Sequence, residues 1–217
     1  MFNKAIILSG GEGLRMRPIT EYIPKALIKK NNKELINYNI DLFHNNEISQ
    51  IIVTYNYLSD ILFSKINKKV TAFLNTTNKD NSYFIFNTII SEINEPFILV
   101  PCDIIFDINF KELYTDYLNQ GEPPIMIVGV NDVEGIDGDY INHIDNNIIS
   151  LGRDKKESFY CSGIQIINPK KINDLITKCD NFYDVWNSLI KINKLKLSNT
   201  HPTKWLAFDK IEHLKNG

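Results

Sequence analysis

Residues 5–28 run AIILSGGEGLRMRPITEYIPKALI, and this stretch decides the expected fold. Residues 5–8 form a short apolar run that is typical of a buried strand. The run ends at Ser9, Gly10 and Gly11, and glycines after a strand let backbone N–H groups surround phosphate oxygens, because no Cβ blocks the approach. The stretch predicts a strand entering a phosphate-binding glycine loop, although a tight turn without a ligand would use the same glycines.

Strands and helices are expected to alternate along the rest of the chain, with buried strands predicted at residues 51–53, 70–74, 97–100, 125–130, 164–167 and 205–208. Helices are predicted at residues 34–43, 58–66, 82–93, 110–118 and 182–192, with another opened by Pro169 and a short one at the C-terminus. Residues 145–147 are expected to turn a hairpin. This order is typical of βαβ units, so we expect an α/β fold with a mostly parallel sheet flanked by helices, as one domain over residues 1–217.

Composition excludes several classes of protein. The net charge is −2 over 217 residues, which argues against nucleic acid or an anionic membrane surface as the main partner. An anionic substrate would therefore need local positive charge. Three widely spaced cysteines fit a reducing compartment, and no apolar run has the length of a spanning helix or a signal peptide, so the cytoplasm is expected.

Two familiar phosphate loops do not fit the glycines. A dinucleotide fingerprint starting at Gly11 needs a glycine at position 16, which is Met16. A Walker A loop needs a lysine directly after its last glycine, whereas Leu14 follows Gly13. What remains is a loop with Arg15 just beyond it and Lys25 ten residues later.

This pattern resembles the signature of the sugar-phosphate nucleotidyltransferases. That signature is L-A-x-G-x-G-x-R-[LM]-x-P-L-T followed by P-K-x-L, and here the chain has LSGGEGLRMRPIT followed by PKAL. The resemblance is fullest over residues 5–28 and continues in order, with fewer matches, to about residue 214. It implies a Rossmann-like (GT-A-type) mixed sheet and a Mg²⁺-dependent enzyme that joins a nucleoside triphosphate to a phosphorylated small molecule.

The resemblance also implies roles for single residues. Arg15 matches the arginine that neutralises the transferring phosphates, and Lys25 matches the lysine that bridges the nucleotide and the acceptor phosphate. Arg17 falls at a variable position and is expected to be a solvated surface arginine. The nucleotide-binding segment would comprise Leu8, Ser9, Gly10, Gly11 and Gly13.

The chemistry agrees with these roles without a general base. The attacking group is a phosphate oxygen that is already anionic, since its second pKa is about 6. Catalysis must position two polyanions in line and offset the charge that moves to pyrophosphate. The lack of a convincing Ser/His/Asp set is therefore expected.

Two aspartates are candidate Mg²⁺ ligands. Asp103 follows the strand predicted at residues 97–100, at the edge where open α/β sheets bind ligands. The resembled family ends this segment in x-G-D, and Cys102 replaces the glycine here. Asp209 follows Trp205 as the second acidic position of the family pattern, while the first is Ala207. A turn or cap role for Asp103 and a helix-cap role for Asp209 remain open.

The acceptor side shows the clearest departures. Arg153 would replace a family lysine that holds the acceptor phosphate, or it is a solvated hairpin arginine. Gly163 resembles a glycine that admits the substrate. Asn81 and Ser82 stand where sugar-specific relatives have an L-G-T-x-G loop that helps hold base and sugar. The pair resembles that of phosphocholine-type cytidylyltransferases, which makes Asn81 and Ser82 candidate nucleotide contacts; Ser82 as an ordinary N-cap is the alternative.

Three functions remain after these observations. The first is nucleotidyl transfer to a sugar 1-phosphate, which gives an activated sugar for surface polysaccharide. The second is cytidylyl transfer to a non-sugar phosphate or phosphonate. The third is a degenerate module that binds nucleotides without turnover, which Ala207 suggests. Loop spacing disfavours a nicotinamide oxidoreductase. We expect no nucleic-acid or membrane partner, and a homodimer is left open.

Overall fold

The computed structural model describes residues 1–131, 135–136, 138–153 and 156–215. Contacts within the chain group into two compact units. The N-terminal unit comprises Asn3–Asn78, Val100–Asp107 and Thr203–Gly217, and the central unit comprises Met1–Phe2, Lys79–Leu99 and Ile108–Pro202. The single domain expected over residues 1–217 stays a prediction.

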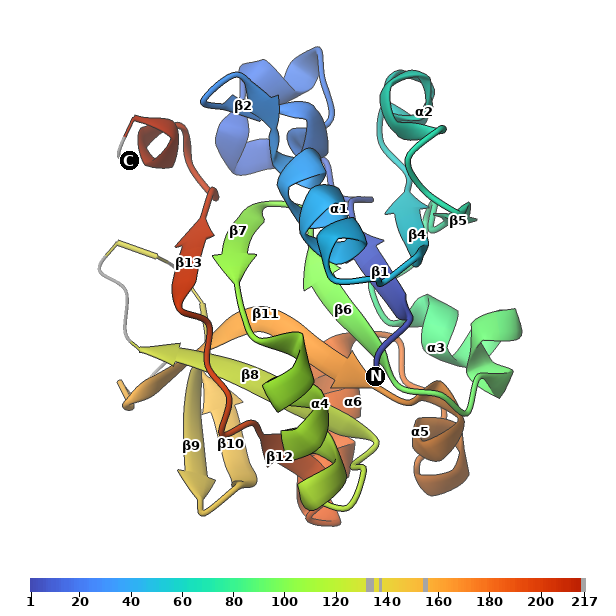
Figure 1. Ribbon diagram of the computed structural model, residues 1–217, viewed down its shortest axis with the longest axis vertical. Helices are drawn as coiled ribbons and strands as arrows, with labels where there is room; N and C mark the ends of the chain where they lie inside the picture. The colour runs from blue at the N-terminus through green and yellow to red at the C-terminus, as the bar shows by residue number, and fades with distance from the viewer. Residues whose placement is uncertain (132–134, 137, 154–155, 216–217) are drawn as a thin grey trace. The chain divides into compact units, whose positions relative to one another are not determined.

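The N-terminal unit is built on three parallel strands in the order β5-β4-β1 (Figure 1). Helix α1 packs against β1, and α2 connects β4 to β5. Two further strands, β7 and β13, pair antiparallel within the same unit, and β2 (Lys29–Lys30) pairs with β3 (Lys33–Glu34). The remaining bounds are β1 Lys4–Leu8, α1 Leu35–Asn45, β4 Gln50–Tyr55, α2 Ser59–Ile66, β5 Ala72–Asn75, β7 Ile104–Asp107 and β13 Lys204–Ala207.

The central unit has the strand order β6-β11-β8-β12-β10-β9, in which β12 and β8 are parallel and the other neighbours are antiparallel. Helix α6 packs against β10 and β12, and α3 contacts α5. The bounds are α3 Tyr83–Asn87, β6 Phe97–Pro101, α4 Phe110–Asn119, β8 Ile125–Asn131, β9 Tyr140–Ile144, β10 Asn147–Gly152, β11 Phe159–Ile167, α5 Pro169–Leu175, α6 Phe182–Lys191 and β12 Leu195–Leu197. The first three residues of β6 belong to this unit.

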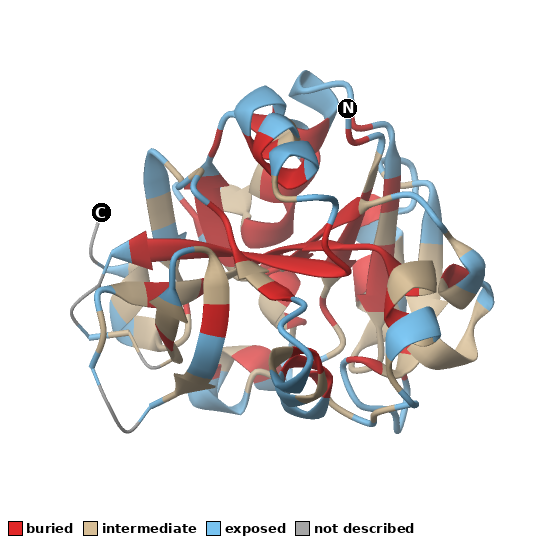
Figure 2. Ribbon diagram, turned by 90° about the horizontal axis from the view of Figure 1, so that it is seen from below, coloured by how far each residue is buried: buried red, intermediate tan, exposed pale blue. Residues whose placement is uncertain are grey.

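The predicted α/β class is confirmed, with a mixed sheet flanked by helices. In both units buried residues concentrate on the strands and on the helix faces that cover them (Figure 2). In the described part of the chain, no helix is both long and apolar enough to cross a bilayer.

One predicted helix is wrong. Residues 82–93 form the short helix α3 and a separate 3-10 turn, Ile89–Glu92. The break lies at Thr88, whose backbone is extended at φ −132° and ψ 174°. The Thr88 hydroxyl accepts a hydrogen bond from the Ile90 N–H and so caps the second turn instead of continuing the first.

A buried carboxylate fixes the end of β12 in the central unit. Asp116 on α4 accepts hydrogen bonds from the Ser198 hydroxyl at 2.7 Å and from the backbone N–H of Asn199 at 2.8 Å. The side-chain amides of Asn199 and Gln120 also donate to it. Burial by itself raises the pKa of Asp116, but these hydrogen bonds outweigh burial and lower the pKa below its ordinary value.

Replacing Asp116 with alanine is expected to lower the free energy of unfolding by about 3 kcal/mol at pH 7, since hydrogen bonds to a charged group contribute about 1.5–3 kcal/mol. Because the pKa is lower in the folded state than the value of about 3.9 in the unfolded chain, the stabilisation is complete above that value and is lost as the pH falls through the folded pKa. Urea unfolding should show a smaller difference between Asp116→Ala and wild type at pH 3 than at pH 7.

Asp174→Ala is the control, because Asp174 forms an exposed pair with Lys170, and this variant should lower the free energy of unfolding by less than about 1 kcal/mol. An equal effect of Asp116→Ala at both pH values would contradict this account.

Candidate active site

The glycine loop is anchored to neighbouring segments of the N-terminal unit at the end of β1. The backbone N–H of Ser9 donates to the Thr54 hydroxyl at 3.0 Å, and the Ser9 hydroxyl donates to the Thr54 carbonyl oxygen on β4. The carbonyl oxygen of Leu8 accepts a hydrogen bond from the Cys102 N–H at 2.9 Å. The loop therefore begins from a fixed position beside both β4 and the turn that holds Asp103.

Two glycines of the loop occupy positions that a side chain would disturb. Gly13 has φ 64° and ψ 40°, in the left-handed region that glycine adopts most readily. A Cβ on Gly10 would lie 2.7 Å from the Thr76 hydroxyl oxygen, and Thr76 is buried with its hydroxyl donating to the Tyr55 carbonyl oxygen. Because of Thr76, only glycine, which has a hydrogen in place of Cβ, fits at position 10 without a steric clash.

The loop also presents backbone donors that the protein itself does not satisfy. Among the described residues, none accepts a hydrogen bond from the backbone N–H of Gly11, Glu12 or Gly13. Successive unpaired N–H groups in a turn form a concave site for anions. The loop can therefore bind phosphate oxygens through its backbone.

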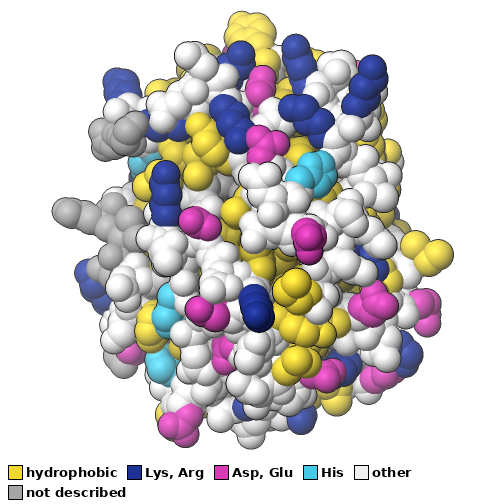
Figure 3. Space-filling model, in the orientation of Figure 1, with side chains coloured by type: hydrophobic (Ala, Val, Ile, Leu, Met, Phe, Trp, Pro, Cys, Tyr) yellow, Lys and Arg dark blue, Asp and Glu magenta, His cyan; other side chains and the backbone are white. Residues whose placement is uncertain are grey.

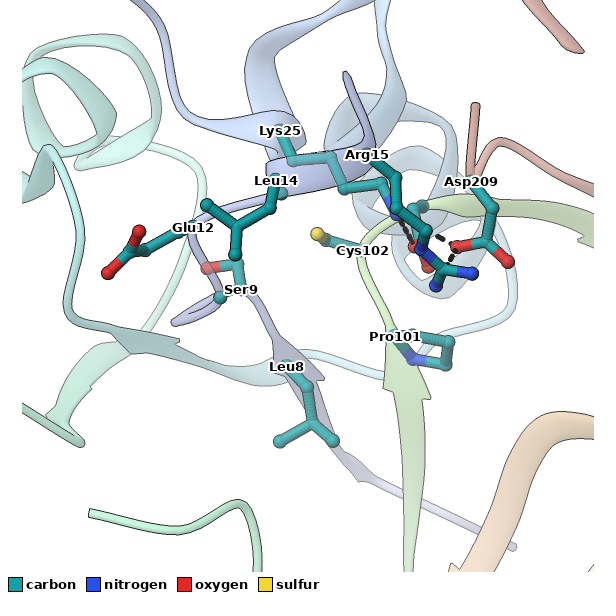
Figure 4. A pocket seen from close by; sticks show the side chains of 12 residues that line it. Leu8, Ser9, Glu12, Leu14, Arg15, Lys25, Pro101, Cys102 and Asp209 are labelled. Carbon is teal, nitrogen blue, oxygen red and sulfur yellow. Dashed lines mark hydrogen bonds and ion pairs between the residues drawn. The ribbon is translucent and has the colours of Figure 1, made fainter. Parts of the chain in front are cut away.

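A pocket of about 610 Å³ opens beside the loop, so the loop is accessible to a ligand. Figure 4 shows Arg15, Lys25 and Asp209 converging at one end of the pocket, with Leu8 and Ser9 at the other side. The lining belongs entirely to the N-terminal unit. It consists of Leu8, Ser9, Gly11, Glu12, Gly13, Leu14, Arg15, Lys25, Pro101, Cys102, Asp103 and Asp209.

Lysine and arginine meet the two predicted metal ligands inside this pocket. The Lys25 ammonium contacts Asp103 Oδ2 and lies 3.1 Å from Asp209 Oδ1. Arg15 Nη2 lies 3.1 Å from the same Asp209 oxygen. The side chains of Lys25, Asp103 and Asp209 are 13%, 17% and 15% exposed, whereas that of Arg15 is 51% exposed and faces open solvent.

Strand pairing explains why two carboxylates 106 positions apart in the sequence come together. Ile104 at the start of β7 pairs with Ala207 at the end of β13. The backbone N–H of Phe208 donates to the Asp103 carbonyl oxygen at 2.9 Å. Asp103 precedes one strand and Asp209 follows the other, so antiparallel pairing brings both carboxylates to the same edge.

The nucleotidyl transferase family matches residues 4–136, which is more than half of the 217-residue chain. This chain belongs to the nucleotidyl transferase family. The mannose-1-phosphate guanyltransferase of Saccharomyces cerevisiae is 26% identical over 187 residues, covering 80% of this chain and 52% of that protein. The choline-phosphate cytidylyltransferase of Streptococcus pneumoniae is 47% identical over 57 residues, covering 26% and 25%. The chain spans about half the length of the guanyltransferases it matches.

Solved structures share the fold at low sequence identity. The inositol-1-phosphate CTP transferase from T. maritima superposes with a TM-score of 0.78 at 19% identity, covering 98% of this chain and 91% of that one. A UDP-glucose pyrophosphorylase complexed with UDP-glucose gives 0.77 at 16% identity, covering 99% and 96%. At these identities the likeness shows that this nucleotidyl transferase has the fold of those enzymes.

Charges and burial in the pocket favour the protonated form of Lys25 and the neutral thiol of Cys102. Burial by itself lowers the pKa of Lys25, but the carboxylates of Asp103 and Asp209 outweigh burial and raise the pKa above its ordinary value. Burial, with Asp103 acting in the same direction, raises the pKa of the Cys102 thiol to about 12. Figure 3 shows lysine and arginine side chains gathered over the N-terminal unit at the top of the view.

The carboxylates fit the Mg²⁺ that this nucleotidyl transferase is expected to use. Mg²⁺ is held by one or two carboxylates, with substrate phosphates and waters completing its shell. Asp103 and Asp209 would supply two, and the described residues contain no cluster of three or more His, Cys, Asp or Glu side chains arranged for a metal. The capping alternative for Asp209 finds no support, because the terminal 3-10 turn begins after Lys210 and the Asp209 carboxylate contacts Lys25 and Arg15.

The predicted nucleotide contacts Asn81 and Ser82 belong to the central unit. Asn81 is exposed and its side-chain oxygen accepts from the Phe182 N–H at 3.3 Å. Ser82 is fully buried, and its hydroxyl donates to the Cys179 carbonyl oxygen without capping α3. A nucleotide contact by Ser82 would have to replace that hydrogen bond.

The two predicted acceptor-side residues, Arg153 and Gly163, also belong to the central unit. Arg153 follows β10, with Nε 3.5 Å from Asp139 Oδ1 and a side chain that is 56% exposed. Gly163 has φ 82° at an irregular register of β11 against β8, typical of a β-bulge. The roles of Asn81, Ser82, Arg153 and Gly163 stay predictions.

Sequence reasoning missed the residues that support the loop. Thr54 lies near the end of β4, which pairs with β1, and Thr76 follows β5, which pairs with β4; their hydroxyls face Ser9 and Gly10. The only available signal was a threonine near the carboxyl end of a predicted strand. That signal is weak, because threonine is common in strands.

Gly10→Ala is expected to lower the free energy of unfolding by about 1–3 kcal/mol, the usual cost of overpacking, and to weaken triphosphate binding about tenfold. Isothermal titration with a nucleoside triphosphate measures the second effect. Gly11→Ala is the matched control for stability, because a Cβ there meets no protein atom within 4 Å. Adding Thr76→Ala to Gly10→Ala should recover part of the stability and of the binding; an equal loss of stability in the two glycine variants would contradict the steric role of Thr76.

Proposed function

We propose that the chain transfers a nucleoside monophosphate from a nucleoside triphosphate to a sugar 1-phosphate and releases pyrophosphate. The observation that carries this proposal is the pocket in which the glycine loop, two cations and two carboxylates meet. The product would be an activated sugar for surface polysaccharide, made in the cytoplasm.

The geometry supports a reaction driven by positioning and charge. The unpaired N–H groups of Gly11 and Gly13 would hold phosphate oxygens of the nucleotide, and Arg15 and Lys25 would offset the charge that accumulates on the leaving pyrophosphate. Asp103 and Asp209 would hold Mg²⁺, which when bound supplies further positive charge to the phosphates. The acceptor phosphate attacks as an anion, so no side chain has to remove a proton.

The comparisons support the same reaction class. The mannose-1-phosphate guanyltransferase relatives align with 80% of this chain, and the fold is shared with enzymes described as acting on nucleotides and phosphorylated sugars or inositol. The choice of base and acceptor for this chain is part of the proposal.

Cytidylyl transfer to a non-sugar phosphate is the second candidate. It is favoured by the 57 residues that are 47% identical to a choline-phosphate cytidylyltransferase. The Asn81–Ser82 pair in place of a glycine-rich loop points in the same direction.

Pyrophosphate release from each of the four common triphosphates, measured with sugar 1-phosphates and with phosphocholine, tests these proposals. Release with one sugar 1-phosphate supports the first, and release with CTP and phosphocholine alone supports the second. Triphosphate binding without pyrophosphate release from any pair would instead favour the degenerate module that Ala207 suggests.

A further inference from the structure

Lys25 makes contacts that a lysine reserved for phosphate would not need. Its ammonium contacts Asp103 and Asp209 at once, and these residues come from two segments joined by the pairing of β7 and β13. Figure 4 shows the side chain reaching across the pocket to this edge. In this arrangement the Lys25 ammonium lies between two carboxylates and offsets their mutual repulsion, while Arg15 also pairs with Asp209.

The same two carboxylates form the proposed Mg²⁺ site. Mg²⁺ binds carboxylate oxygens at about 2.0–2.1 Å, and an ammonium on those oxygens would leave two like charges in close contact. Lys25 must therefore leave at least one of the carboxylates before they can ligate a cation.

The fold allows this movement and gives the released ammonium a destination. The backbone of Lys25 is fixed in a 3-10 turn, with the Ile28 N–H donating to its carbonyl oxygen at 3.1 Å. Its flexible stem packs on the glycine loop, because a Cβ on Gly13 would lie 3.2 Å from Lys25 Cβ and 3.5 Å from Cδ. A released ammonium would thus stay beside the unpaired N–H groups of the loop.

We infer that Lys25 occupies the place of the divalent cation between Asp103 and Asp209. When the cation binds there, it displaces the Lys25 ammonium, which then binds phosphate, so cation binding and phosphate binding are coupled. This inference rests on the proposed function, because the metal site does. In the protein without nucleotide, Lys25 lowers the affinity of the carboxylates for a cation. By reciprocity, a cation bound to the carboxylates raises the affinity of Lys25 for phosphate by the same factor.

Mn²⁺ binding to the nucleotide-free protein, followed by the electron paramagnetic resonance signal of free Mn²⁺, tests the exchange. Lys25→Met is expected to bind Mn²⁺ about 10- to 100-fold more tightly than wild type, the range that corresponds to loss of a hydrogen bond to a charged group. Lys29→Met is the matched control, because it removes the same charge from the same unit at an exposed lysine that contacts Glu34, and its affinity should equal that of wild type. Asp103→Asn should lose most Mn²⁺ binding in either background.

Lys25→Met removes the ammonium from Asp103, while Arg15 still pairs with Asp209. A melting experiment covers the case in which this variant is unstable. Mn²⁺ should then raise the melting temperature of Lys25→Met more than that of wild type. If Lys25→Met binds Mn²⁺ no more tightly than wild type while Asp103→Asn loses binding, the exchange is wrong and the metal site stands. If Asp103→Asn leaves Mn²⁺ binding unchanged, the metal site of the proposed function fails, and the exchange fails with it.

Discussion

Asp103→Ala is expected to lower kcat about 100- to 1000-fold while the protein stays folded. This loss corresponds to about 2.7–4 kcal/mol, the range measured when one preorganised charge-stabilising contact is removed elsewhere. Stability should fall somewhat because Lys25 loses its carboxylate partner. The contact of residue 103 with Phe208 uses its backbone carbonyl and remains in alanine, so the fold is kept. Pyrophosphate release under saturating substrates, together with a thermal melt, measures both expectations.

Asp107→Ala provides the matched control for that variant. Asp107 ends β7, is exposed, and belongs to the same unit, so its loss removes an equal charge away from the pocket. Its kcat should stay within about twofold of wild type, since surface substitutions change energies by about 0.5 kcal/mol. Near-wild-type turnover in Asp103→Ala would refute the assignment of Asp103 as a metal ligand.

Arg15→Ala is expected to reduce kcat/KM by about 100- to 1000-fold. Arg15 is half exposed and pairs with Asp209, and surface pairs of this kind contribute about 0–1 kcal/mol to stability. The loss should therefore appear in catalysis and not in the melting temperature. Arg15→Lys should recover only part of the activity, because lysine lacks the planar pair of donors that matches phosphate oxygens.

Arg17→Ala tests whether Arg15 acts through its specific position or only through the positive charge of the loop. Arg17 lies two residues away with a comparable exposed fraction, 49%, and its guanidinium lies 3.6 Å from Glu12. Its replacement should leave kcat/KM within about twofold of wild type. Equal losses in the two arginine variants would mean that the loop attracts phosphate through its net charge and that Arg15 has no specific place.

Elements with strong local periodicity could be predicted from the sequence. The run before Ser9 is strand β1, and the apolar spacing from Ile36 to Phe43 lies on α1. The hairpin turned at residues 145–147 joins β9 to β10 as expected. In each case the signal lies within a few neighbouring residues, where apolar spacing matches the helical or strand period.

Elements that depend on distant partners could not be predicted. Strand β7 begins at Ile104, with two residues between it and the end of β6, and it is a strand because it pairs with β13 a hundred residues later. That pairing also brings Asp209 to Asp103. The family resemblance names both as candidate Mg²⁺ ligands, but local periodicity alone gives no sign that they meet. The support of Gly10 by Thr76 likewise depends on the parallel register of β4 and β5.

A crystal structure of the protein with a nucleoside triphosphate and Mn²⁺ tests the central claim most directly, because the anomalous signal of Mn²⁺ locates the cation independently of the nucleotide. The account predicts phosphate oxygens within hydrogen-bond distance of the Gly11 and Gly13 N–H groups, the cation on the Asp103 carboxylate, and Lys25 withdrawn from Asp103 onto a phosphate. A triphosphate bound away from the glycine loop, or a cation that does not contact Asp103, would contradict it.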